Sequence, residues 1–231
     1  KDQENYRREF LGNISHELKT PLFTIQGYIL TLVEGGAIRD KKVRDKYLKR
    51  AAKGVDRIIS IVKDLDLITQ FESGIKTIDR SEFNICDLID NVFDLLEFES
   101  EKNNISLKLD NNNNSLIYVY ADQERIIQVL TNLIVNSIKY GSDNGYTKVI
   151  VEDFNKEKVI VRIIDNGEGI EEEHIPRLFE RFYRIDKNRS RKKGGSGLGL
   201  SIVKHIIEAH NEQIFVKSEI GTGTEFSFTL S

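Results

Sequence analysis

A histidine followed directly by a glutamate is the first pair in the chain whose residue types could do chemistry. His16 and Glu17 lie in a helix-forming segment, and a carboxylate beside an imidazole can hold one ring nitrogen and leave the other as nucleophile. Thr20 is four residues further on, so it shares the outer face of the helix with His16. Pro21 removes the backbone hydrogen bond to the Glu17 carbonyl and is expected to bend the helix. Such a defect near an exposed histidine suggests a function, although a solvated surface histidine is the alternative.

A polar stripe on a second, mostly apolar helix is the next candidate. The helix is expected over Asp122–Tyr140, and at about 100° per residue its polar side chains fall within one narrow arc. These side chains are Arg125, Gln128, Asn132, Asn136 and Lys139. Asparagine is a poor helix former, so Asn132 and Asn136 are interpreted as ligand or metal contacts. Bonds from these amides to neighbouring backbone groups are the alternative.

Two glycine-rich segments could bring backbone N–H groups close to a ligand. Asp165–Ile170 follows a predicted strand, and Gly194–Leu200 opens a predicted helix. A glycine-rich turn at a helix N-terminus suits phosphate binding, although as a turn alone it needs no ligand. No Gly-Lys-Ser/Thr follows, which excludes a Walker loop, and no βαβ unit surrounds the segment, which argues against a dinucleotide fold.

Heptad spacing organises the first 72 residues. Leu11, Leu18, Ile25 and Leu32 recur every seven residues with Ile14 and Tyr28 as companions, and two further rows follow, Leu48–Val55–Val62 and Ala51–Ile58–Leu65. With Leu11 at position a, His16 falls at f and points to water. Gly35–Gly36 interrupts the pattern and predicts an antiparallel helical hairpin. A lone hairpin buries one seam, so two copies are expected to form a four-helix bundle.

The remainder of the chain mixes helical and alternating patterns. Helices are expected at 85–103 (with Asn84 as N-cap), 122–140, 175–182 and 198–210, and strands at 105–109, 117–120, 149–153, 159–164, 214–218 and 225–230. The irregular order predicts an α+β two-layer sandwich, one sheet against helices.

Composition excludes several classes of protein. Apolar residues make up 39% of the chain and the net charge is −3, so there is no basic excess that would indicate a nucleic-acid partner. No apolar run is long enough for a membrane span. The single cysteine, Cys86, forms no internal disulfide, and no Cys/His cluster has metal-ligand spacing. The abrupt start without methionine suggests a fragment of a longer protein.

The order of these segments resembles the H, N, G1, F, G2 and G3 boxes of bacterial sensor histidine kinases over essentially the whole chain. The F box is matched by Leu178–Arg184 and the last box by Gly221–Thr224. The resemblance implies a dimerisation and phosphoacceptor domain at 1–72, a linker at 73–80, and a Bergerat-type ATP-binding domain at 81–231.

The same resemblance assigns roles to individual residues. His16 would be the phosphoacceptor, Glu17 its base, and Asn132 an assisting residue near the nucleophile. Asn136 would hold Mg²⁺, Asp165 would read the adenine amino group, and residues 185–196 resemble the mobile ATP lid. The remaining nucleotide contacts would be Lys139, Tyr140, Gly167, Gly169, Ile170, Tyr183, Arg184, Ser196, Gly197, Leu198, Gly199, Leu200 and Thr224.

The resemblance also implies a reaction and a partner. ATP would phosphorylate His16, and the phosphoryl group would pass to an aspartate of a separate response regulator. The Glu-x-x-Thr pattern at Glu17–Thr20 marks members that also dephosphorylate the regulator, unless Thr20 merely bonds a carbonyl of the preceding turn. Sensor and membrane segments are expected upstream, which makes this a cytoplasmic domain of a bacterial inner-membrane protein. A related ATPase and a nucleotide-binding dimeric scaffold are the alternatives.

Overall fold

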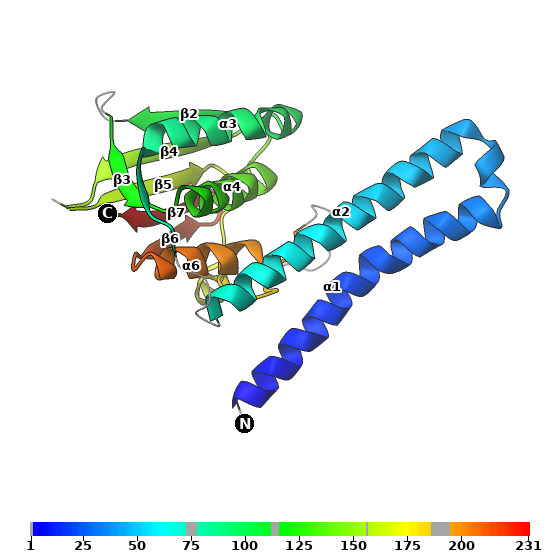
Figure 1. Ribbon diagram of the computed structural model, residues 1–231. Helices are drawn as coiled ribbons and strands as arrows, with labels where there is room; N and C mark the ends of the chain where they lie inside the picture. The colour runs from blue at the N-terminus through cyan, green and yellow to red at the C-terminus, as the bar shows by residue number, and fades with distance from the viewer. Residues whose placement is uncertain (1, 73–77, 112–115, 156, 186–194) are drawn as a thin grey trace. The chain divides into compact units, whose positions relative to one another are not determined.

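The chain folds into two compact units, Lys1–Thr69 and Gln70–Ser231. The computed structural model describes residues 2–72, 78–111, 116–155, 157–185 and 195–231 (Figure 1). No helix among the described residues is long and apolar enough to cross a membrane.

The first unit is the predicted helical hairpin. Helix α1 (Asp2–Val33) continues through Pro21, and a short 3₁₀ helix η1 (Ala37–Arg39) connects it to α2 (Lys41–Glu72). The turn needs Gly36, whose φ of +67° lies in the left-handed region that favours glycine. The break between the helices therefore falls where the glycine pair predicted it.

A glycine on α2 lets the two helices approach closely near their middle. A Cβ atom on Gly54 would lie 2.6 Å from Cγ1 of Ile25 and 3.6 Å from the carbonyl oxygen of Pro21. Any side chain at position 54 would therefore push α1 away. Pro21, one of the two residues in this contact, lies about one and a half turns after His16 along α1.

The second unit is a five-stranded sheet with helices on one face (Figure 1). The strand order is β2-β4-β5-β7-β6, with β2 and β4 parallel and the other neighbours antiparallel. The strands are β2 (Ser106–Asn111), β4 (Tyr146–Asp153), β5 (Val159–Asp165), β6 (Ile214–Glu219) and β7 (Gly223–Leu230). The helices are α3 (Ile85–Lys102), α4 (Gln123–Tyr140) and α6 (Gly199–Ala209), and β1 (Ser81–Asn84) pairs with β3 (Tyr118–Ala121) in a separate antiparallel ribbon. The predicted α+β two-layer architecture is confirmed.

The core lies between the sheet and the helices. Val149, Val151, Val161 and Ile163 alternate along β4 and β5 and are at most 1% exposed. The apolar face of α4 is buried as fully, which explains why this helix is apolar except for one stripe.

Local predictions in this unit had mixed outcomes. Asn84 caps α3 as expected, because its side chain accepts the Cys86 N–H at 3.1 Å. Strand β1 was not predicted. The α-helix predicted at 175–182 was wrong, since a 3₁₀ helix η2 (Glu172–Arg177) ends there and turns follow. Pro176 lacks an N–H, and Phe182 adopts a φ of +61°, so a regular helix cannot continue through this stretch.

A buried histidine fixes the chain at the entry to the second unit. His210 Nε2 accepts the Asp122 N–H at 2.9 Å, and its Nδ1 lies 2.8 Å from the Ile206 carbonyl oxygen. The Arg80 guanidinium donates to the His210 carbonyl at 2.8 Å, and the Asp79 N–H donates to Asp122 at 3.3 Å. This group of four residues, 79, 80, 122 and 210, is called the entry cluster. It ties the incoming chain to the start of α4 and the end of α6.

The entry cluster predicts a loss of stability in mild acid. Burial lowers the pKa of His210 below its usual value of 6.5, although its bond to Ile206 raises it. The unfolded chain therefore binds a proton at His210 near pH 6.5, whereas in the folded chain His210 stays neutral at that pH. The free energy of unfolding should fall as the pH drops below that value, by up to about 1.4 kcal/mol per pH unit.

Urea unfolding at about pH 7.5 and about pH 5.5 measures this effect. His210→Gln keeps an acceptor that does not titrate, so its loss between the two pH values should be smaller than that of the wild type. His205→Gln, at a histidine within α6, is the control and should keep the wild-type difference. Equal pH dependence in His210→Gln and wild type would contradict the prediction.

Candidate functional site

The candidate phosphoacceptor region lies on α1. His16 is exposed, as its heptad position predicted, and Glu17 beside it is half-buried. The Glu17 carboxylate accepts from Arg57 of α2, with 3.1 Å between Oε2 and Nη2. The Thr20 hydroxyl donates to the His16 carbonyl at 3.2 Å, which is the local bond that was the alternative interpretation of Thr20.

Asp165 is the central group of the second unit. It ends β5, is 8% exposed, and its Oδ1 accepts the N–H groups of Gly167 at 2.9 Å and Thr224 at 3.2 Å. Burial raises the pKa of Asp165 above its usual value, although the two N–H bonds lower it. Both described bonds end on Oδ1. Within the described chain every fully buried side-chain polar atom has a partner, so Oδ2, which has none there, must reach the surface and can accept from a ligand.

Glycines let the backbone close in around Asp165. A Cβ atom on Gly167 would lie 2.4 Å from the Tyr140 carbonyl oxygen, and one on Gly223 would lie 2.0 Å from the Asp165 carbonyl oxygen. Gly169 has a φ of +75°, which favours glycine. The structure therefore brings together four predicted nucleotide contacts: Tyr140, Asp165, Gly167 and Thr224.

Two polar residues beside Asp165 were missed in the sequence. Ser218 accepts the Ile170 N–H at 2.9 Å, donates to the Gly223 carbonyl at 2.9 Å, and lies 2.8 Å from the Thr224 hydroxyl. Asn166 accepts the Tyr146 N–H at 2.9 Å. Only the pairing of β6 with β7, which sets Ser218 opposite Thr224, could have indicated the first of these.

One residue of the polar stripe of α4, Asn132, lies against the start of α6. A Cβ atom on Gly199 would lie 3.4 Å from Oδ1 of Asn132, so the asparagine lies at the first turn of α6. Asn136 and Lys139 are half-buried one and two turns further along the same stripe. Asn136 offers an amide oxygen of the kind that Mg²⁺ accepts.

The segment between the F box and α6 is held by backbone bonds. Phe182 donates its N–H to the Gly197 carbonyl at 2.8 Å, and the Arg184 guanidinium bonds the Gly195 carbonyl. Gly197 has a φ of +77°, and Leu198, which bonds the Ser196 hydroxyl, is fully buried. Residues 186–194 of the predicted ATP lid lie outside the described residues. Gly199 and Leu200, also predicted contacts, are half-buried in the first turn of α6.

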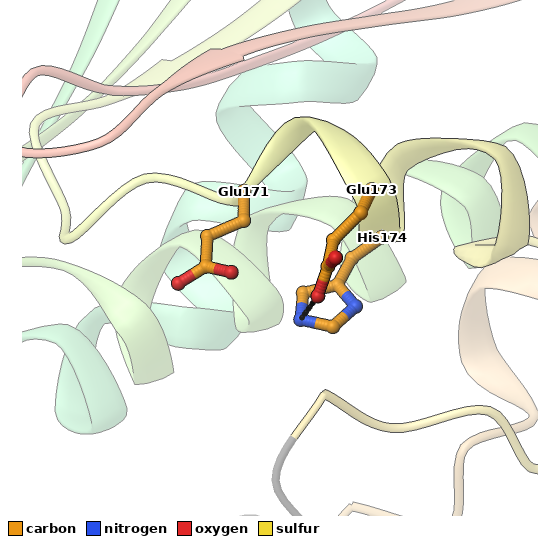
Figure 2. A group of neighbouring side chains, drawn as sticks. All are labelled: Glu171, Glu173 and His174. Atoms are coloured by element: carbon orange, nitrogen blue, oxygen red, sulfur yellow. Dashed lines mark ion pairs between the residues drawn. The ribbon is translucent and has the colours of Figure 1, made fainter.

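Tyr183 belongs to a small cluster with η2. Its hydroxyl lies 2.8 Å from His174 Nδ1, and the Arg177 guanidinium stacks 4.4 Å from its ring centroid. Donor atoms of Glu171, Glu173 and His174 lie within 4.8 Å of one another, as Figure 2 shows. Exposed carboxylates often gather in this way without an ion, so the arrangement alone does not make a metal site.

Comparison with known proteins decides the family. Residues 6–74 match the His Kinase A (phospho-acceptor) domain, and residues 121–231 match the histidine kinase-, DNA gyrase B- and HSP90-like ATPase. The catalytic domain of the histidine kinase ThkA is 34% identical, and the chain covers 95% of it with a TM-score of 0.58. The chain belongs to the sensor histidine kinases. The predicted family is confirmed.

Other kinases of this family match over nearly the whole chain. The sensor histidine kinase WalK of Bacillus subtilis is 36% identical over 99% of the chain, which spans 37% of the length of WalK. The Acinetobacter baumannii histidine kinase AdeS is 26% identical with a TM-score of 0.76, covering 94% of this chain and 97% of AdeS. ThkA in complex with the response regulator protein TrrA is 28% identical with a TM-score of 0.69, covering 99% of this chain and 63% of ThkA.

Proposed function

We propose that this histidine kinase core transfers the γ-phosphoryl group of ATP to His16 and then to an aspartate of a separate response regulator. The observation that carries the proposal is the exposed His16, beside Glu17, on a helix of the matched phosphoacceptor region. An imidazole at the surface can receive a phosphoryl group and offer it to a second protein, which a buried one cannot. ThkA, a relative, has been solved in complex with a response regulator protein.

The residues around Asp165 are proposed to bind ATP. The carboxylate would accept a hydrogen bond from the adenine amino group, and the surrounding backbone would line the base. Asn136 would hold Mg²⁺, which neutralises phosphate charge during transfer. Lys139, Arg184 and the first turn of α6 would bind the phosphates, since cations and free N–H groups at a helix start suit them.

The transfer itself needs few groups. One ring nitrogen of His16 attacks the γ-phosphorus, a nitrogen–phosphorus bond forms, and the bond to the leaving ADP oxygen breaks. Glu17 would accept the proton on the other ring nitrogen and so increase the electron density of the attacking one. Asn132 of α4, whose side chain lies near Gly199 at the start of α6, would assist beside the reacting groups.

A homodimer through residues 1–72 is proposed on the exposed apolar side chains of the hairpin. Within a single chain Leu11 is 62% exposed, Leu48 51%, Val55 45% and Val62 45%. These residues belong to the predicted heptad rows, and a second hairpin would cover them in a four-helix bundle. The linker is proposed at 73–80, between the end of α2 at Glu72 and the start of β1 at Ser81.

The proposed setting is the cytoplasmic side of a bacterial inner membrane. It rests on the likeness to WalK, whose name gives it as a sensor kinase. A related ATPase of the same nucleotide fold is disfavoured, because residues 6–74 match a phosphoacceptor domain. A non-catalytic scaffold is disfavoured by the presence of His16, Glu17, Asn136 and Asp165 together.

His16→Gln should abolish incorporation of label from γ-³²P-ATP, while fluorescent-ATP affinity stays near the wild-type value, because Gln cannot form phosphohistidine. The wild-type label should be acid-labile and alkali-stable. His205→Gln is the matched control and should still incorporate label. Incorporation of label into His16→Gln, or a wild-type label that is stable in acid, would contradict the proposal.

Asp165→Asn should weaken ATP binding, because an amide places a donor where the carboxylate accepts. Hydrogen bonds to charged groups contribute roughly 1.5–3 kcal/mol, so the dissociation constant should rise about tenfold or more. Since the pKa of Asp165 is raised, wild-type affinity should also fall as the pH drops and the carboxylate takes up a proton. Isothermal titration calorimetry of ATP binding at several pH values checks both effects. An unchanged ATP affinity in Asp165→Asn would show that Asp165 has only a structural role.

Thr20 is proposed to assist dephosphorylation of the regulator. Its hydroxyl lies one turn from His16 on the exposed face, where it could orient a water molecule towards a docked phosphoaspartate. Thr20→Ala should keep autophosphorylation within a few-fold and slow regulator dephosphorylation by about tenfold, or roughly 1.4 kcal/mol. Thr24→Ala, which removes a similar hydroxyl bond one turn later, is the control. Equal dephosphorylation by wild type and Thr20→Ala would assign Thr20 to helix structure alone.

A further inference from the structure

One ion pair reaches across the hairpin to the residue beside His16. Arg57 Nη2 on α2 donates to Glu17 Oε2 on α1 at 3.1 Å, although the two residues are forty positions apart. The Glu17 side chain is 14% exposed and that of Arg57 27%, so water screens this pair less than a surface pair. It is therefore a stronger restraint on the carboxylate than an exposed ion pair would be.

The backbone brings these two side chains together at a defined place. Gly54 lies one turn before Arg57 on α2, and it allows the close approach to Pro21 and Ile25 on α1. Pro21 in turn lies one turn after Glu17. The contact of Gly54 with Pro21 and Ile25 therefore brings Arg57 opposite Glu17. The guanidinium binds the carboxylate of Glu17, the residue next to the exposed His16.

The pair has a consequence for the proposed transfer. A glutamate side chain has three rotatable bonds, and holding it in one arrangement costs conformational entropy. A group that must accept an imidazole proton acts well only when it is already held near its working geometry. A carboxylate has about four lone-pair sites, so a bond from Arg57 is compatible with a further bond to His16.

We propose that Arg57 is a positioning residue, which holds the Glu17 carboxylate from across the hairpin for its work on the His16 imidazole. This inference rests on the proposed function. Arg57 acts through Glu17 and does not itself touch the reacting atoms. It belongs to the hairpin unit, whereas the proposed ATP-binding residues belong to the other unit, so its loss should affect the transfer step and not the binding of ATP.

Autophosphorylation kinetics of the wild type, Arg57→Gln, Arg57→Lys, Glu17→Gln and the double variant Glu17→Gln/Arg57→Gln test the proposal. Arg57→Gln should lower kcat about fivefold or more with KM for ATP unchanged, since only the transition state loses an interaction. Arg57→Lys keeps the charge and should recover part of the rate. In the Glu17→Gln background the Arg57→Gln change should cost nothing further, because the carboxylate it acts through is gone.

Arg50→Gln is the matched control. Arg50 also reaches from α2 to α1, where it bonds the Tyr28 hydroxyl at 3.4 Å and lies 5.7 Å from the Tyr28 ring centroid. Its loss should leave kcat within about twofold of wild type, because no reacting group is near. Thermal melts and light scattering on each variant report folding and dimerisation separately.

The outcomes separate the two ideas. A wild type that forms no acid-labile phosphohistidine overturns the proposed function and the inference with it. A labelled wild type with a slow Glu17→Gln but a normal Arg57→Gln overturns the inference alone. The inference is also overturned if Arg57→Gln lowers kcat by the same factor in the Glu17→Gln background as in the wild type. It is overturned as well if Arg50→Gln lowers kcat as much as Arg57→Gln does. In either case the effect would be structural.

Discussion

A single carboxylate organises the second unit. Asp165 stands at the end of a central strand, where it binds the N–H groups of Gly167 and Thr224 and so joins the loop after β5 to the start of β7. Burial raises the pKa of this carboxyl group, whereas the two N–H bonds lower it and so favour the charged form. The surrounding glycines are then required, because a side chain at position 167 or 223 would collide with the backbone that surrounds the carboxylate. The loop geometry, the choice of glycine and the accessible oxygen all follow from keeping this one charge in place.

The hairpin solves a different physical problem. It must keep one histidine in water while neighbouring residues hold two helices together. Heptad spacing keeps His16 in water, because this residue falls on the outer face of α1. The absence of a side chain at Gly54 lets the two helices pack closely together. Glu17 lies between these two surfaces, adjacent to the exposed histidine in sequence and bonded to the opposite helix in space.

Much of this could be predicted from periodicity and residue type. The hairpin, the helix over 123–140 and most strands were predicted because their patterns span many residues, and the exposure of His16 followed from its heptad position. The helix predicted at 175–182 was wrong, because the sequence pattern does not report that Phe182 turns back to bond Gly197. Arg57 and Ser218 could not have been found, since their partners are distant in the sequence and meet them only through helix packing or strand register. The nucleotide contacts named by resemblance remain predictions for the residues around Asp165.

The entry cluster gives the second unit a mechanical property. The chain enters at Asp79 and Arg80, where hydrogen bonds fasten it to the first residue before α4 and to the residue after α6. A hydrogen-bonded helix is stiff along its axis. A displacement of residue 79 would therefore move α4 as a whole. Asn132 and Asn136 lie on that same helix. A displacement of the chain at Asp79 would therefore be transmitted through α4 to Asn132, whose side chain lies near the first turn of α6.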